Sequence, residues 1–170
     1  LWAWAMLPVH GDALLAPAGF LVWLALLLGV YAAARALGAA ERRSVLAALS
    51  VGTTPALLSL VTSSYVDHTV AALFALGAVF LLRAIRGGSP ADGLLAVAAA
   101  GAGVAVKISA APILVLSGVV ALARLWKRRP EGRLGFRIAV LLAVPFVGAF
   151  PYLRAWVEQG SPFYPIPLAV

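Results

Sequence analysis

The sequence predicts an all-α protein, a polytopic bundle of about six transmembrane helices. Of the 170 residues, 64% are hydrophobic and only 11% are charged, whereas a soluble domain is about 45–50% apolar and about 25% charged. The mean hydropathy is +1.03, and the charged residues stand between long apolar runs. These observations exclude a soluble globule and a disordered chain, and the absence of cysteine excludes a disulfide scaffold.

Uncharged intervals divide the chain into crossings. A transmembrane helix needs about 20 apolar residues, in a range of about 17–25. Ala13–Ala34 and Ser44–Val66 are long enough alone, and the other intervals reach that length when flanking charged side chains snorkel to the interface. Leu1 is not a start residue, so we expect a fragment of a longer protein. The expected single transmembrane domain has crossings at residues 13–34, 45–62, 66–83, 92–107, 110–126 and 137–153, an outer juxtamembrane segment at 1–12 and an outer loop at 154–170.

The fourth and fifth crossings are expected to form a hairpin. Between Asp92 and Arg124 the only charged residue is Lys107. A single helix over this interval would be roughly 45 Å long at about 1.5 Å per residue, too long for a hydrocarbon core of about 30 Å. The chain should therefore turn near Lys107 and Pro112.

Basic residues sort to one face under this segmentation. Only Lys107 and Arg154 fall on the other face, and the positive-inside rule makes the basic face cytoplasmic. The eleven of thirteen Lys and Arg residues that share it are Arg35, Arg42, Arg43, Arg83, Arg86, Arg124, Lys127, Arg128, Arg129, Arg133 and Arg137.

The outer face is where we expect chemistry, because ionisable groups near a membrane are costly and often functional. His10 and Asp12 read as a turn and N-cap region before the first crossing. Asp67 has two compatible interpretations: a capping box with Ser64 as N-cap and Asp67 at N3, or a carboxylate that binds a metal ion or orients a phosphate-bearing ligand. His68 is expected to be interfacial rather than catalytic.

The other outer-face candidates also have two readings each. Lys107 is a snorkelling lysine or an ammonium placed over an anionic headgroup or phosphate. Arg154 and Glu158 are spaced i,i+4 and are expected to pair on a helix end, with ligand binding as the alternative. The proline-rich tail at 160–167 should be extended, and its aromatic residues, including Tyr164, line a cleft or rest in the interface.

Motifs of nucleotide and metalloprotease chemistry are absent. The sequence has no G-x-x-x-x-G-K-[ST], G-x-G-x-x-G or H-E-x-x-H pattern and no D-x-D pair. Nucleotide hydrolysis and nucleic-acid binding are therefore not expected of this chain, because membrane topology accounts for its basic loops.

Short motifs along nearly the whole chain carry a family resemblance. They are Tyr31–Gly38 at the end of a crossing, Thr54-Pro55 inside the next, Ser63–Asp67 opening a helix, Gly103–Lys107, and Gly160–Tyr164 followed by Pro165. In order and spacing they resemble polyprenyl-phosphate-dependent membrane glycosyltransferases of the GT-C fold, in the protein O-mannosyltransferase and aminoarabinose-transferase-like branch.

The resemblance implies an enzyme of the bacterial inner membrane with a periplasmic active face. Such enzymes move a sugar from a polyprenyl-phosphate carrier to an acceptor glycan, lipid or protein. The principal catalytic carboxylate would precede Leu1, Asp67 would lie near the active site, and Lys107 would lie near the lipid phosphate. The candidate substrate-binding residues are Asp67, Lys107, His68, Arg154 and Tyr164, and Asp67 is the candidate ligand for a divalent metal, a cofactor that the resemblance leaves open.

Two other functions fit the composition. In a segment of a multi-pass solute transporter, Asp67 and Lys107 would gate or bind the solute; a non-catalytic membrane scaffold would use neither. Transporters place ionisable residues near the bilayer midplane beside broken helices. Here every charge can be drawn to a helix end, which favours the transferase.

Overall fold

The computed structural model describes residues 13–61, 66–128 and 134–162, and within these ranges it contains helices and no strand. The all-α prediction is confirmed. The elements are α2 (Leu15–Ala36), α3 (Glu41–Gly52), α4 (Pro55–Val61), α5 (Asp67–Ile85), α6 (Pro90–Val106), the short 3-10 helix η2 (Ile108–Ala110), α7 (Ala111–Arg128) and α8 (Leu134–Gln159).

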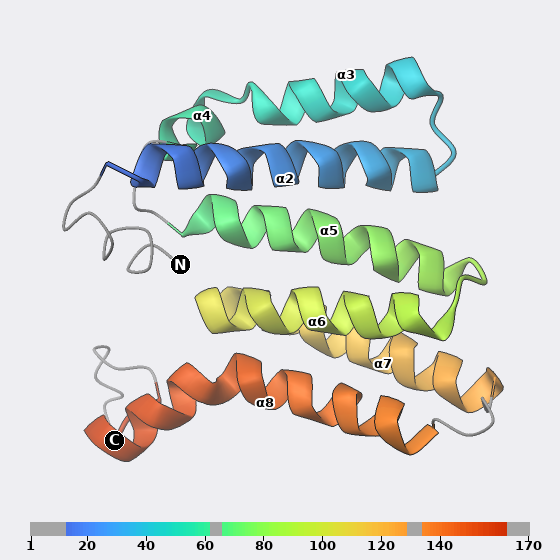
Figure 1. The fold of residues 1–170 in the computed structure, drawn as a ribbon, viewed down its shortest axis with the longest axis vertical. Helices are drawn as coiled ribbons and strands as arrows, with labels where there is room; N and C mark the ends of the chain where they lie inside the picture. Colours follow the sequence, from blue (N-terminus) through green and yellow to red (C-terminus); the bar gives the residue numbers. More distant parts are fainter. Residues whose placement is uncertain (1–12, 62–65, 129–133, 163–170) are drawn as a thin grey trace.

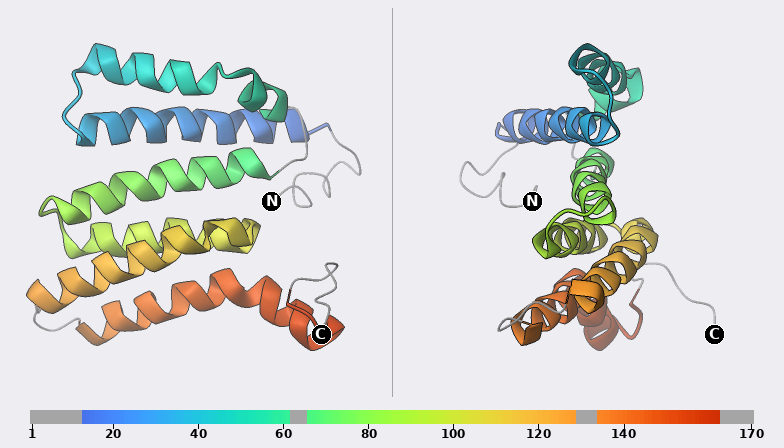
Figure 2. Two further views of the ribbon diagram at one scale, coloured as in Figure 1. Left: turned by 180° about the vertical axis from the view of Figure 1, so that it is seen from behind. Right: turned by 90° about the vertical axis from the view of Figure 1, so that its right-hand side faces the viewer.

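The long helices lie side by side and alternate in direction, so their ends gather at two ends of the molecule, at the left and the right of Figure 1. From one edge to the other the order is α3 with α4, then α2, α5, α6 and α8, with α7 packed on α6 (Figures 1 and 2). Helix α5 is central because it packs on both α2 and α6.

The two ends differ in charge, as the sequence predicts. We call one end the basic end; it holds the α2–α3 and α5–α6 turns and the end of α7 (Figure 1). Asp67, Lys107, Arg154 and Glu158 belong to the opposite end, where α5 begins and α6 and α8 finish. Among the described residues, the Lys and Arg of the basic end are Arg35, Arg42, Arg43, Arg83, Arg86, Arg124, Lys127, Arg128 and Arg137.

Two helices, α2 and α5, are each long and apolar enough to cross a membrane, with mean hydropathies of 2.0 and 1.9. The pair α3 and α4 qualifies as a third span if its two bent halves count as one. Helix α6 and residues 108–124 are apolar but shorter. The full count of six crossings stays a prediction.

The second expected crossing, over 45–62, is bent rather than straight, and its membrane span stays a prediction. Helices α3 and α4 meet at a 68° bend. Pro55 explains the break, since proline has no N–H and disfavours helical geometry in the residue before it. Trp23 Nε1 donates to the carbonyl of Gly52 at 2.9 Å, and the Thr53 and Thr54 hydroxyls donate to carbonyls one turn back, at 2.8 and 3.1 Å.

The predicted hairpin between the fourth and fifth crossings is confirmed. Helix α6 ends at Val106, and Lys107 is extended, with φ −156° and ψ 128°. The chain then passes through η2 into α7. Pro112 lies in the first turn of α7, where its missing N–H breaks no helical hydrogen bond.

Small residues bring α6 and α8 into close contact. A Cβ atom at Gly148 would lie only 2.5 Å from the carbonyl oxygen of Gly101. One turn further along α8, the Tyr152 hydroxyl donates to the carbonyl of Val104 at 2.9 Å. This is the close packing that small residues permit between membrane helices.

The last helix is longer than the sequence predicts. The outer loop was expected to begin at residue 154, but α8 continues to Gln159. The helix stops where Gly160 takes φ +72°, a left-handed conformation that favours glycine.

Candidate functional site

The main polar contact at the opposite end joins α5 to the end of α6. Asp67 is the first residue of α5, and Lys107 is the C-cap residue of α6. The Lys107 Nζ lies 2.5 Å from Asp67 Oδ1, and both side chains are about half exposed, at 48% and 49%. Each charge also suits its helix end, since acidic groups are favoured at an N-terminus and basic groups at a C-terminus.

The position of Asp67 in α5 differs from the one expected in a capping box. The N-cap of α5 is Val66, which makes no side-chain capping bond, so Asp67 occupies the first helical position rather than N3. Ser64, the expected N-cap, lies outside the described residues. The carboxylate of Asp67 is instead engaged by the ammonium of Lys107.

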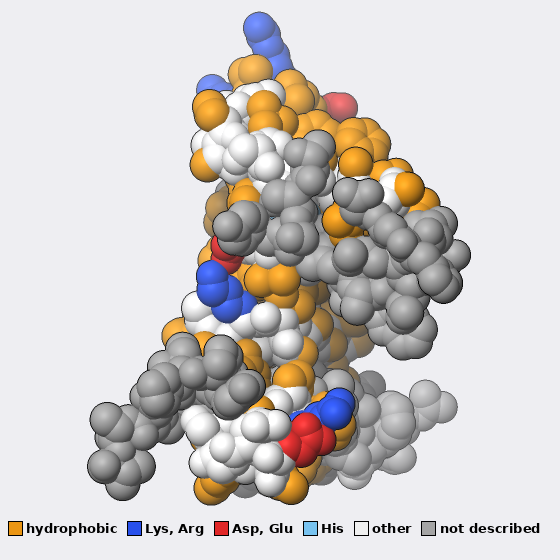
Figure 3. All heavy atoms as spheres, turned by 90° about the vertical axis from the view of Figure 1, so that its left-hand side faces the viewer, with side chains coloured by type: hydrophobic (Ala, Val, Ile, Leu, Met, Phe, Trp, Pro, Cys, Tyr) orange, Lys and Arg blue, Asp and Glu red, His pale blue; other side chains and the backbone are white. Residues whose placement is uncertain are grey.

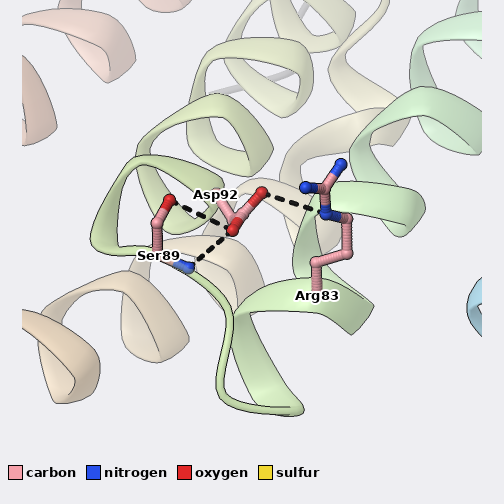
Figure 4. Close-up of polar contacts among 3 residues, drawn as sticks. All are labelled: Arg83, Ser89 and Asp92. Atoms are coloured by element: carbon pink, nitrogen blue, oxygen red, sulfur yellow. Dashed lines mark hydrogen bonds and ion pairs between the residues drawn. The ribbon is translucent and has the colours of Figure 1, made fainter.

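A capping box does form at the basic end, where none was predicted. The Ser89 backbone N–H and hydroxyl both donate to Asp92 Oδ2, at 2.7 and 3.2 Å, and Arg83 Nε lies 3.3 Å from Asp92 Oδ1 (Figure 4). The signal was present in Ser89-Pro90-Ala91-Asp92, which has the S-x-x-[DE] pattern with proline at the first helical position.

His68 is buried within the bundle, and its interfacial rather than catalytic role stays a prediction. Its side chain is buried, with 1% of the residue exposed, and Thr69 beside it is 5% exposed. Successive helical residues point about 100° apart. Asp67 therefore faces the surface, whereas His68 faces the interior of the bundle.

Arg154 and Glu158 form the predicted i,i+4 pair on the last turns of α8. The Arg154 Nε lies 2.8 Å from Glu158 Oε1, and the side chains are 64% and 50% exposed. Figure 3 views this end of the molecule, where acidic and basic side chains adjoin in small groups among hydrophobic ones. The two charges of this pair neutralise each other. A ligand role for Arg154 stays a prediction.

The remaining candidates have no structural test. His10, Asp12 and Tyr164 lie outside the described residues. In the described part of the chain, no three His, Cys, Asp or Glu residues gather in a group that could hold a metal ion. Asp67 is thus a lone carboxylate beside an ammonium, and its role as a metal ligand stays a prediction.

Residues 3–149 match the family model of dolichyl-phosphate-mannose-protein mannosyltransferases. The chain belongs to this family. No curated protein and no solved structure matches it. The matched residues include Asp67 and Lys107, whereas Arg154 and Tyr164 follow them.

Membership of the mannosyltransferase family identifies a glycosyltransferase of the membrane-embedded GT-C type, which takes its sugar from a lipid-linked donor. The apolar helices agree with an integral membrane protein. At the opposite end of this protein, the half-exposed ammonium of Lys107 is in contact with the half-exposed carboxylate of Asp67. An ammonium is suited to a phosphate, and a carboxylate to a hydroxyl or a cation.

Proposed function

We propose that this protein transfers a sugar from a polyprenyl-phosphate carrier to an acceptor glycan, lipid or protein at the end that carries Asp67 and Lys107. In this proposal that end faces the periplasm of a bacterial inner membrane, because the basic end carries the charge expected of a cytoplasmic face. Family membership supports the reaction class. The proposed location of the reaction rests on the contact between Lys107 and Asp67.

Lys107 has the chemistry to stabilise the leaving phosphate. When the acceptor oxygen or nitrogen attacks the anomeric carbon, the bond from that carbon to the phosphate oxygen breaks and negative charge develops on polyprenyl phosphate. A fixed cation lowers the barrier by meeting that developing charge. The ammonium of Lys107 lies at a helix end and is half exposed, so a headgroup in the interface has access to it. The acceptor proton passes to a carboxylate that we place before Leu1, acting as general base.

Asp67 is the partner that the donor phosphate replaces. A half-exposed ion pair contributes only about 0–1 kcal/mol, so Lys107 can exchange the carboxylate for a phosphate at little cost. The exchange frees the Asp67 carboxylate for the acceptor or for a divalent cation bound with the donor. The resting ion pair thereby holds both groups close to their working positions.

The test is transfer by the full-length enzyme in membranes with Lys107→Ala. We expect transfer to fall by about 10²-fold or more, the usual loss on removing a group that meets transition-state charge, while yield and detergent-extracted stability stay close to wild type. Lys127→Ala is the matched control, because it also removes an exposed lysine, but from α7 at the basic end. Full activity of Lys107→Ala would overturn the assignment.

The transporter alternative has one observation in its favour, the break between α3 and α4. Discontinuous helices in transporters present ends to a solute near the midplane. At this break, however, the residues are Thr53 and Thr54, whose hydroxyls bond to carbonyls of α3. Solute uptake by reconstituted protein that survives Lys107→Ala, without any glycosyl transfer, would favour the transporter.

A further inference from the structure

The last turn of α6 leaves one carbonyl for a partner outside the helix. The Lys107 N–H donates to the Gly103 carbonyl at 2.8 Å, but Lys107 itself is extended, so the chain leaves the helical path there. Ile108 then begins η2. In a continuing helix the Ile108 N–H would donate to the carbonyl of Val104, but among the described residues no backbone N–H does so.

A tyrosine of α8 supplies the missing donor. The Tyr152 hydroxyl donates to the Val104 carbonyl at 2.9 Å, across 48 positions of the sequence. Val104 is only 5% exposed, and a buried carbonyl that has lost its helical donor is costly unless another group replaces it. Tyr152 therefore completes the C-terminal cap of the helix end that carries Lys107.

The chain after Lys107 is packed closely on the same helix end. The Ala110 N–H donates to the Lys107 carbonyl at 3.1 Å, and Ala110 is 3% exposed. A Cβ atom at Gly103 would lie 3.2 Å from the Cβ of Ala110, so η2 lies directly against the last turn of α6. The backbone of Lys107 is thus held on both sides, whereas its side chain is 48% exposed.

We propose that Tyr152 is a positioning residue for Lys107, an inference that rests on the function proposed above. The hydroxyl of Tyr152 holds the last turn of α6, and that turn sets where the ammonium meets the donor phosphate. A charged group stabilises a transition state best when it is fixed before the reaction begins. Tyr152 follows the residues that match the family model, so family membership does not assign this role.

The test compares initial rates of glycosyl transfer by the full-length enzyme in membranes. Tyr152→Phe keeps the ring and removes the hydroxyl. We expect kcat to fall about fivefold to tenfold and KM for the donor to change by less than about twofold, because a loosened group loses most where charge is greatest, in the transition state. Tyr31→Phe is the matched control, since it removes the hydroxyl of another half-buried tyrosine, in α2, and should keep kcat.

A double-mutant cycle shows whether Tyr152 acts through Lys107. In the Lys107→Ala background we expect Tyr152→Phe to lower the residual rate by less than about twofold, because the group that it positions is gone. An equal factor in both backgrounds would show that the tyrosine serves only the fold, and would overturn the inference. Thermal midpoints of all variants are measured in detergent, and the rates are measured well below them.

The same variants separate this inference from the proposed function. Wild-type kcat in Tyr152→Phe, together with loss of transfer in Lys107→Ala, would overturn the role of Tyr152 and leave the proposed function standing. Full activity of Lys107→Ala would overturn the proposed function, and the positioning role with it.

Discussion

The ammonium of Lys107 lies 2.5 Å from a carboxylate oxygen of Asp67, across 40 positions of the sequence. This contact closes the open end of the hairpin formed by α5 and α6, and the contact of Arg83 with Asp92 closes the turn end. The two pairs differ in burial, because the Asp67 side chain is 49% exposed and that of Asp92 is 8% exposed. We therefore expect the first pair to serve function and the second to serve stability.

Replacing Asp67 should change donor binding more than stability. In Asp67→Asn the ammonium of Lys107 loses its anionic partner and is available to the donor phosphate, so we expect KM for the polyprenyl-phosphate sugar to fall several-fold. The unfolding free energy should change by about 0–1 kcal/mol, as for exposed ion pairs. Initial rates against donor concentration check this, with Glu158→Gln as the control. An unchanged or higher KM would contradict exchange of partners at Lys107.

Swapping the two charges separates the ion pair from the proposed phosphate site. The double variant Asp67→Lys with Lys107→Asp restores opposite charges at the same positions, although both now oppose the helix dipoles at a cost of about 0.3–1 kcal/mol each. We expect it to be nearly as stable as either single variant, and inactive in transfer, because a carboxylate replaces the ammonium at 107. Recovery of activity in the swapped protein would show that the pair acts only structurally.

Replacing Asp92 should destabilise the fold. In Asp92→Ala the Ser89 N–H and the Arg83 guanidinium both lose their acceptor, and a lost partner of this kind costs about 1–3 kcal/mol. Thermal unfolding of the purified protein measures the loss. Asp67→Ala is the matched control, since it removes an aspartate from the other end of the same hairpin. A drop in Asp67→Ala as large as in Asp92→Ala would contradict the assignment of roles from burial.

Much of the architecture could be predicted because the charged residues of a membrane protein lie at the helix ends, outside the hydrocarbon core. The turn at Lys107 and the sorting of arginines to one end depend on where apolar runs stop, and both are visible along the chain. The contact of Asp67 with Lys107 was not predictable, because it depends on how α5 packs against α6. The burial of His68 was not predictable for a related reason: its neighbour is exposed, and only the packing of α5 decides which of two adjacent residues faces inward.

The sequence contains Thr54-Pro55, a pair that favours a helix break, but we predicted a single crossing through it. Proline breaks a helix by removing one donor, yet membrane helices often tolerate it when other groups satisfy the backbone. Here Trp23, from α2, supplies a donor to the Gly52 carbonyl at the break. That tertiary contact stabilises a 68° bend, and the sequence alone does not indicate that Trp23 contacts Gly52.

The contact between α6 and α8 predicts a large effect from one methyl group. In Gly148→Ala the new Cβ would lie 2.5 Å from the Gly101 carbonyl oxygen, a backbone atom that moves only if the helices separate. Separation also strains the hydrogen bond from Tyr152 to Val104, so we expect a loss of about 1–3 kcal/mol, as for other overpacked sites. Gly118→Ala in α7 is the control, since no atom of the described residues lies within 4 Å of its Cβ position, and alanine there should stabilise the helix by about 0.5–1 kcal/mol. Thermal midpoints of the two variants should therefore move in opposite directions, and a Gly148→Ala protein as stable as Gly118→Ala would show that α8 does not pack on α6 at these glycines.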